Sequence, residues 1–255
     1  MHILLPPSEG KTPGGRGKPL SIDAEDGPLA AARADVLAAV EKLVAGDADA
    51  AAQALLLPPG VAAEAIATNA TVRASRTLPA LRRYAGVVYD GLGYTSLSPA
   101  AAKLAGRSVL VFSGLLGVIR GNEPVPHYRV PAKAELPGIG IVGTFWKAVL
   151  ADVLAAQLAR GLVVDLRSSD YSAMWRPSKE QAARVLTVRI LSRTPSGTYA
   201  VISYNSKFAK GRLAAALLEG EAGGSVITSI EDVATHWHGP RVEQTSATHL
   251  DLIAD

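Results

Sequence analysis

One segment constrains the fold of this chain more than any other, because a helical pattern leads directly into an apolar strand. Over residues 143–160, the large apolar side chains Trp146, Leu150 and Leu154 recur on one face of a helix. Residues 162–166 follow almost at once, and they have the pattern of a strand that is buried on both faces. Such a strand lies in a sheet covered by helices, so the segment predicts an α/β fold.

The rest of the chain supplies further elements of such a fold. Apolar runs predict other strands, at 2–5, 108–112, 186–191, 198–204, 225–230 and 249–253. The pair at 186–204 surrounds a Pro-Ser-Gly turn and predicts a hairpin, hence a mixed sheet. Helical patterns occupy 29–44, 47–57, 61–69, 73–84, 99–104 and 206–219. We therefore predict one α/β domain over residues 1–255, a mixed sheet surrounded by helices, with a helical segment near the N-terminus at 28–84 that forms a subdomain.

Composition excludes several classes of protein. Hydrophobic residues make up 48% of the 255 positions and charged residues 19%, so the chain can bury a large core and is not globally disordered. The absence of cysteine excludes disulfides, thiolate metal sites and a cysteine nucleophile. Apolar runs are too short for a membrane helix and the N-terminus has no signal-peptide pattern, so we expect a cytoplasmic protein without a membrane partner. The net charge of +3 allows local basic surfaces only.

A polar loop follows the first predicted strand. Its Gly10-Lys11-Thr12 resembles the end of a phosphate-binding P-loop, but Leu5 stands where that motif needs its first glycine. The following Pro13-Gly14-Gly15 also prevents the helix that the motif requires, which excludes a Walker A nucleotide site. Ser8 and Lys11 remain candidates for binding a ligand at a strand end, and an ordinary surface loop is the alternative.

A second strand end carries a pair of glycines. Ser113-Gly114-Leu115-Leu116-Gly117 leads to Arg120, and the glycines allow either a sharp structural turn or close approach to a nucleic-acid phosphate. A structural turn is the interpretation that the pattern favours. Arg120 and Arg129, with His127 and Tyr128 between prolines, are better placed to bind an anion.

Two later segments contain clustered polar groups. Ser168, Asp170 and Tyr171 follow the buried strand at 162–166. Two roles fit them there: binding of a sugar, base or phosphate, or capping of a helix. Lys207 and Lys210, with Arg212 beyond them, lie in the first turns of a predicted helix and oppose its dipole by about 0.3–1 kcal/mol each. An external anion would explain these cations, and a solvated basic face is the alternative. His236-Trp237-His238 lacks a recognised ligand pattern, so we expect no metal and no cofactor.

Taken in order along the chain, these motifs resemble the YaaA peroxide stress protein family. The resemblance rests on Pro7–Thr12, Val88–Leu92, Ser113–Arg120, Tyr128-Arg129, Phe145-Trp146, Asp165–Ser168 with Tyr171 and Pro177, and Ile202–Gly211. It implies a mixed α/β fold with a positively charged cleft, and protection from hydrogen peroxide by limiting free iron and DNA damage. It also implies binding of double-stranded DNA through a helix-hairpin-helix-like element, which would correspond to residues 113–120.

Two hypotheses about function remain open. In the first, the protein binds DNA phosphates without reading bases, through residues Ser8, Lys11, Ser113, Gly114, Gly117, Arg120, Arg129, Lys207, Lys210 and Arg212. In the second, it is an enzyme acting on a nucleotide, nucleoside or nucleobase, with catalytic candidates Lys11, Tyr89, Ser168, Asp170, Tyr171 and Lys207. Both hypotheses predict that the four polar motifs converge on one concave site at an edge of the sheet.

Overall fold

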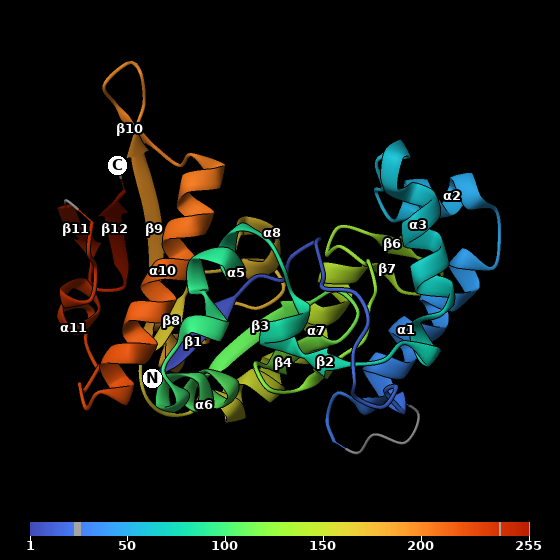
Figure 1. Cartoon of the computed structure of the whole chain (residues 1–255), viewed down its shortest axis with the longest axis horizontal. Coiled ribbons are helices and arrows are strands. Elements are labelled where there is room, and N and C mark those ends of the chain that lie inside the picture. Colours follow the sequence, from blue (N-terminus) through green and yellow to red (C-terminus); the bar gives the residue numbers. More distant parts are fainter. Residues whose placement is uncertain (23–26, 240, 255) are drawn as a thin grey trace.

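An eight-stranded mixed sheet forms the centre of the molecule (Figure 1). The computed structural model describes residues 1–22, 27–239 and 241–254. Strand order across the sheet is β11-β12-β9-β8-β1-β3-β4, with β10 paired to β9. The strands are β1 (His2–Leu5), β3 (Val109–Ser113), β4 (Gly117–Arg120), β8 (Val163–Asp165), β9 (Val185–Arg193), β10 (Tyr199–Ala200), β11 (Arg241–Ser246) and β12 (His249–Ile253). The predicted α/β mixed-sheet class is confirmed.

The direction of the strands brings distant parts of the sequence together. Strands β12, β9, β8, β1 and β3 run parallel to one another, while the edge strands β11 and β4 are antiparallel to β12 and β3. Leu4 pairs with Leu110 on one side and with Asp165 on the other. Because the carboxyl ends of parallel strands meet at one edge, the loops after β1, β3 and β8 are neighbours there.

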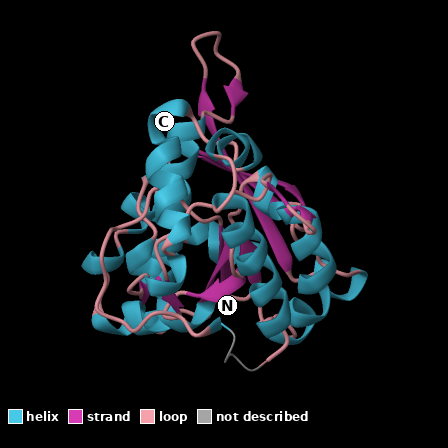
Figure 2. Cartoon of the chain, turned by 90° about the vertical axis from the view of Figure 1, so that its right-hand side faces the viewer, coloured by secondary structure: helices cyan, strands magenta, loops and turns pink. Residues whose placement is uncertain are grey.

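Helices lie on both sides of the sheet (Figure 2). Strands β1 and β3 are buried almost completely, as their continuous apolar sequences predict for strands covered on both faces. The helices after the N-terminal segment are α5 (Val87–Leu92), α6 (Pro99–Ser108), α7 (Val142–Gln157), α8 (Ser169–Ser172), α9 (Lys179–Ala182), α10 (Ser203–Ala222) and α11 (Ile230–Thr235). Helix α10 packs closely on α5, because Gly91 and Gly211 leave no side chain between the two backbones.

The N-terminal helical segment is only partly as predicted. Helices α1 (Ala30–Val44), α2 (Ala48–Ala54) and α3 (Pro59–Ala70) lie at the opposite end of the molecule from α11 (Figure 1). The helix predicted at 73–84 is wrong, because the chain there forms a 3-10 turn, strand β2 (Leu78–Pro79) and the short α4 (Ala80–Arg83). Pro79 explains the break, since a proline disfavours helical backbone at the residue before it. Strand β2 pairs with β5 (Pro124–Val125).

Three other differences have local causes. The strand predicted at 225–230 is wrong, because Ser229 caps α11 through a capping box with Asp232. In the predicted hairpin only Tyr199–Ala200 pairs with β9, and α10 begins at Ser203 rather than at residue 206. Strands β4, β11 and the small pair β6 (Glu135–Leu136) and β7 (Gly140–Ile141) were not predicted, because they are short or lack an apolar run.

No single helix in the described part of the chain is long and apolar enough to cross a membrane. Helices α2 and α3 reach that length and composition only as a pair, across a bend of 99°.

Candidate functional site

Polar side chains gather where β1, β3 and β8 end. The loop after β1 is fixed there by Tyr89, whose hydroxyl donates to the carbonyl of Pro6 at 2.8 Å. A bridge between Lys11 and Tyr84 holds the next part of the loop. The buried Arg83 guanidinium then donates to the carbonyls of Thr12 and, at 2.8 Å, of Gly14. The polar loop is therefore anchored to the fold rather than free on the surface.

Lys11 occupies the centre of this cluster. Its Nζ donates to the carbonyl of Ser8 at 2.9 Å and lies 4.3 Å from the ring centre of Tyr128 and 5.3 Å from that of Tyr84. Burial lowers the pKa of the Lys11 ammonium to about 7, Glu9 raises it, and Arg129 and Arg83 lower it further. At neutral pH a substantial fraction of this amine is therefore uncharged and able to accept a proton.

A chain of hydroxyl groups runs beneath the amine. Tyr84 and Tyr128 share a hydrogen bond of 2.7 Å between their hydroxyls, and Tyr128 shares one of 2.6 Å with Ser113. The backbone N–H of Leu116 donates to the Ser113 hydroxyl at 2.9 Å, which fixes the end of the chain. Burial raises the pKa of both Tyr84 and Tyr128, so both phenols stay protonated at neutral pH.

Arg129 borders the cluster on its outer side. Its guanidinium pairs with the Glu9 carboxylate at 2.5 Å, and its backbone exchanges hydrogen bonds of 2.8 and 2.9 Å with the buried side chain of Asn69. The Nε atom of Arg129 is buried and has no hydrogen-bond partner among the described residues. A cavity of only about 10 Å³ adjoins these groups, lined by Pro7, Ser8, Glu9, Lys11, Tyr128, Arg129, Val130, Pro131 and Tyr171. It has room for about one water molecule.

A buried ion pair follows β8. Arg167 binds Asp165 through two hydrogen bonds of 2.9 and 2.6 Å, and its guanidinium lies 4.3 Å from the ring centre of Phe112. The same side chain donates to the carbonyl of Tyr171 at 3.1 Å, which positions the turn that carries Tyr171. Lys210 reaches across from α10 and donates to the carbonyl of Arg167 at 3.0 Å. Burial lowers the pKa of Lys210, and Asp165 raises it.

The structure brings together part of the predicted site. Ser8, Lys11, Arg129 and Tyr171 line the small cavity, and Ser113 joins them through Tyr128. Tyr89 and Lys210 support neighbouring backbone, as described above. Ser168 occupies the N-cap position of α8, although its side chain makes no capping hydrogen bond.

Other predicted residues lie elsewhere or have structural partners. Arg120 is exposed and pairs with Leu110, so it lies toward the amino end of β3, away from the cluster. Asp170 forms an ion pair of 2.8 Å with Lys133. Lys207 and Arg212 are exposed on α10. The predicted convergence therefore holds for the loops after β1, β3 and β8, and Arg120 takes no part in it.

Comparison with known proteins places the chain in a family. A family described as peroxide stress protein YaaA matches residues 1–235. The chain belongs to this family. A UPF0246 protein of Streptomyces coelicolor is 44% identical over 219 residues, covering 86% of this chain and 83% of that protein. A UPF0246 protein of Corynebacterium efficiens is 34% identical over 239 residues, covering 92% and 91%.

The glycine turn does not have the form expected from the YaaA resemblance. Residues 109–120 form the β3–β4 hairpin, with strands rather than helices on both sides of the turn. A side chain at Gly114 would overlap the carbonyl of Val130, and one at Gly117 would come within 2.7 Å of the Trp146 ring. These glycines therefore serve close internal packing, as the structural-turn interpretation predicted, and their backbone is not open to a DNA phosphate.

Sequence reasoning missed several members of the Lys11 cluster. Tyr84 and Arg83 end what looked like a helix, and their role depends on the bridge to Lys11. Asn69 lies in a helical pattern with nothing to mark it as the buried partner of Arg129. Arg167 had a visible signal, because an arginine two residues after an aspartate in a buried strand needs a partner. The pattern alone places its side chain at a polar strand end and does not show that it pairs with Asp165.

Proposed function

We propose that this YaaA-family protein acts in the peroxide stress response through the cluster at Lys11, where it binds and processes a small anionic molecule of the nucleotide or nucleobase class. The observation that carries the proposal is the position of the Lys11 amine, which lies near two tyrosine rings and, among the described residues, is hydrogen-bonded only to the carbonyl of Ser8. An amine held this way is costly as a structural device, because burial penalises its charged form. Groups with strongly shifted pKa values are found more often at functional sites than elsewhere in proteins.

Each member of the cluster has a chemical role in this proposal. Uncharged Lys11 accepts a proton from the bound molecule. Ser113 donates to Tyr128 and Tyr128 donates to Tyr84, so the Tyr84 hydroxyl is the one whose proton is free for the bound molecule. Arg129 binds the anionic group, because it has an unused buried donor at Nε and its present partner Glu9 is mostly exposed. The ligand enters when the Glu9 side chain moves aside, since the cavity beside it holds only about one water.

The test is a thermal-shift screen of nucleoside monophosphates, nucleobases and inorganic phosphate. A ligand that binds the native state raises the melting temperature. We expect Arg129→Gln to remove the shift and Lys11→Met to remove its dependence on pH near 7. Arg120→Gln is the matched control, because this exposed arginine lies away from the cluster. A screen without any shift, or shifts that Arg129→Gln leaves unchanged, would overturn the proposal.

Binding of double-stranded DNA is a second candidate, and one observation favours it. The bridge between Gly17 and Thr77 places Arg16 and Lys18 beside Arg76. All three side chains are exposed, and none forms an ion pair with a described residue. Neighbouring like charges destabilise the free protein, so a phosphate backbone is a suitable partner. If the protein binds DNA, we propose that it also protects DNA and limits free iron in the cytoplasm. The salt dependence of DNA affinity tests this binding.

A further inference from the structure

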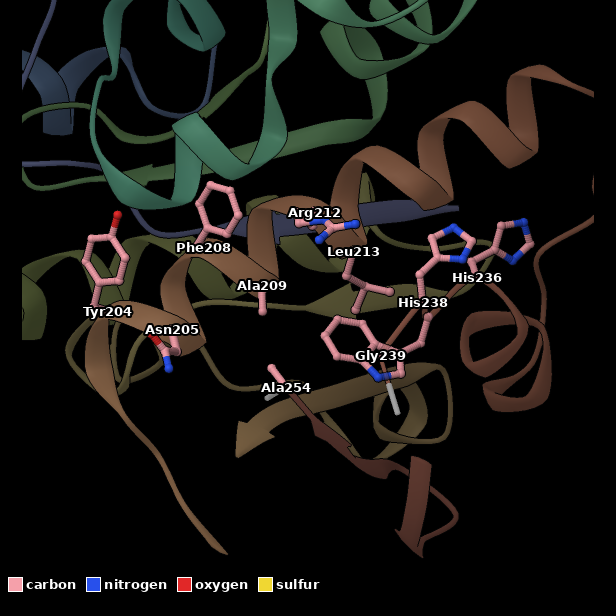
Figure 3. Close-up of a pocket in the computed structure, with 11 residues that line it drawn as sticks. Tyr204, Asn205, Phe208, Ala209, Arg212, Leu213, His236, His238, Gly239 and Ala254 are labelled. Atoms are coloured by element: carbon pink, nitrogen blue, oxygen red, sulfur yellow. The ribbon is translucent and has the colours of Figure 1, made fainter. Parts of the chain in front are cut away.

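A second cavity lies far along the chain from the Lys11 cluster, between α10 and the segment that follows α11 (Figure 3). Its volume is about 370 Å³, within the range of small-molecule sites. It shares no lining residue with the cavity beside Lys11. The lining residues are Tyr204, Asn205, Phe208, Ala209, Arg212, Leu213, His236, Trp237, His238, Gly239 and Ala254.

The α10 wall presents two aromatic rings and a cation in one row. Tyr204, Phe208 and Arg212 follow each other at a spacing of four residues, so they project from one face of the helix (Figure 3). Tyr204 is 65% exposed and Phe208 is 38% exposed. Both rings are exposed to solvent, and Arg212 beside them has no ion pair with a described residue. Together they form a surface on which a planar group can stack.

The opposite wall is held rigidly. His236 packs on α10 where Gly220 leaves room for its ring, and its Nδ1 lies 2.8 Å from the carbonyl of Asp232. This arrangement fixes the next residue, Trp237, against Gly239. The indole Nε1 of Trp237 is buried and has no hydrogen-bond partner among the described residues. His238 is exposed at the rim of the cavity.

The chemistry of the walls indicates the class of ligand. The lining includes the aromatic rings of Tyr204, Phe208 and Trp237, on which a planar ring can stack, and the Arg212 guanidinium, which can bind an anion. A metal ion does not fit, since the described residues contain no group of three metal-ligating side chains. We propose that this cavity is a binding site for a small molecule that carries a planar aromatic or heteroaromatic ring and one anionic group.

The site goes beyond the function proposed for the Lys11 cluster. The family match ends at residue 235, so the wall formed by residues 236–239 lies outside it. The cavity thus combines a helix inside the matched region with a segment beyond it. The identity of its ligand therefore has to be tested on this chain and cannot be inferred from the family.

Calorimetry and tryptophan fluorescence test the site with defined probes. Adenosine monophosphate and 4-hydroxybenzoate carry both a ring and an anion, adenosine carries only the ring, and ribose 5-phosphate carries only the anion. We expect one of the two complete probes to bind at least tenfold more tightly than either partial probe. Binding should change the accessibility of Trp237 to a soluble quencher, because Trp146 and Trp175 are buried in the core.

Variants assign the binding to this cavity. Arg212→Gln should weaken the complete probe about tenfold and leave adenosine unaffected, the usual effect of losing one charged hydrogen bond. Phe208→Leu should weaken the complete probe and adenosine together. Arg107→Gln is the matched control, an exposed arginine on α6, and Lys11→Met separates this site from the proposed one. Melting temperatures establish that each variant folds.

Three outcomes would overturn the inference. They are the absence of binding by both complete probes, binding that Arg212→Gln and Phe208→Leu leave unchanged, and binding that Lys11→Met abolishes. The last result would assign the ligand to the Lys11 cluster and support the proposed function instead.

Discussion

At the scale of single residues, the burial of the Lys11 amine has a consequence for stability. In the unfolded chain this amine has its ordinary pKa of 10.5, and in the folded protein its pKa is about 7. Between these values the unfolded state binds more protons, so the free energy of unfolding rises with pH in this window. Below the folded value both states are protonated, and the full cost of the buried charge is present.

We therefore predict that native protein gains stability relative to Lys11→Met as the pH rises from about 7 to about 10. Urea unfolding at a series of pH values measures the free energy of unfolding of both proteins. Subtracting the value of the variant removes the contribution of groups that titrate equally in both. Parallel stability curves for the two proteins would show that Lys11 keeps an ordinary pKa in the fold.

Gly117 provides a second prediction at this scale. Its φ of +73° lies in the left-handed region, and an added Cβ would come within 2.7 Å of the Trp146 ring. Gly117→Ala should cost about 2–4 kcal/mol, the sum of backbone strain and overpacking. Gly161 has nearly the same φ, +77°, but nothing within 4 Å of the added atom, so Gly161→Ala should cost only about 1–2 kcal/mol. Equal losses in chemical denaturation would mean that the hairpin does not pack on Trp146 as described.

At the scale of elements, α10 separates two lysines that look alike in the sequence. The helix begins at Ser203, so Lys207 and Lys210 lie in its second and third turns, where the dipole penalty expected from the sequence is small. Lys207 is exposed, whereas Lys210 donates to the carbonyl of Arg167. The two positions should therefore respond differently to substitution.

We predict that Lys207→Gln changes stability by less than about 0.5 kcal/mol, as is usual for a surface residue. Lys210→Met should cost about 1–3 kcal/mol, because it leaves the Arg167 carbonyl without its hydrogen bond. Thermal or urea unfolding of both variants provides the comparison. If the two substitutions have the same effect, the hydrogen bond from Lys210 to the Arg167 carbonyl contributes nothing measurable.

The sequence predicts best those elements that form because of their own local residue pattern. Strand β1 and helix α7 follow from continuous apolar runs and from one apolar helix face, so both were predicted within a few residues. The segment 73–84 was read as a helix because its apolar spacing fits one, although Pro79 marked the break. Strand β11 is polar at every position except Val242, and it forms by pairing with β12. Pairing of that kind depends on tertiary context rather than on local pattern.

At the scale of the whole molecule, the candidate site depends on topology. The parallel order β8-β1-β3 brings the ends of three strands together, which the motifs after those strands allowed the sequence to predict. The sequence did not show which cations would be neutralised inside the fold. Arg129 pairs with Glu9 and Arg167 with Asp165, while Lys11 is partly uncharged near neutral pH. The positions of charged residues in the sequence therefore do not show where net positive charge is exposed on the folded protein.

This distribution leads to a prediction about duplex DNA. From the sequence, four to six phosphate contacts would give a slope of about −4 to −5 in a plot of log affinity against log salt. The patch of Arg16, Lys18 and Arg76 contributes three cations, so we predict a slope of about −3 with little dependence on DNA sequence. Fluorescence anisotropy with a labelled duplex at several salt concentrations measures it. Replacing all three residues by glutamine should remove most of the slope, whereas Lys207→Gln with Arg120→Gln should change it little. Binding that persists with an unchanged slope in the triple variant would assign the DNA contacts to another surface, and an absence of binding at low salt would exclude this candidate function.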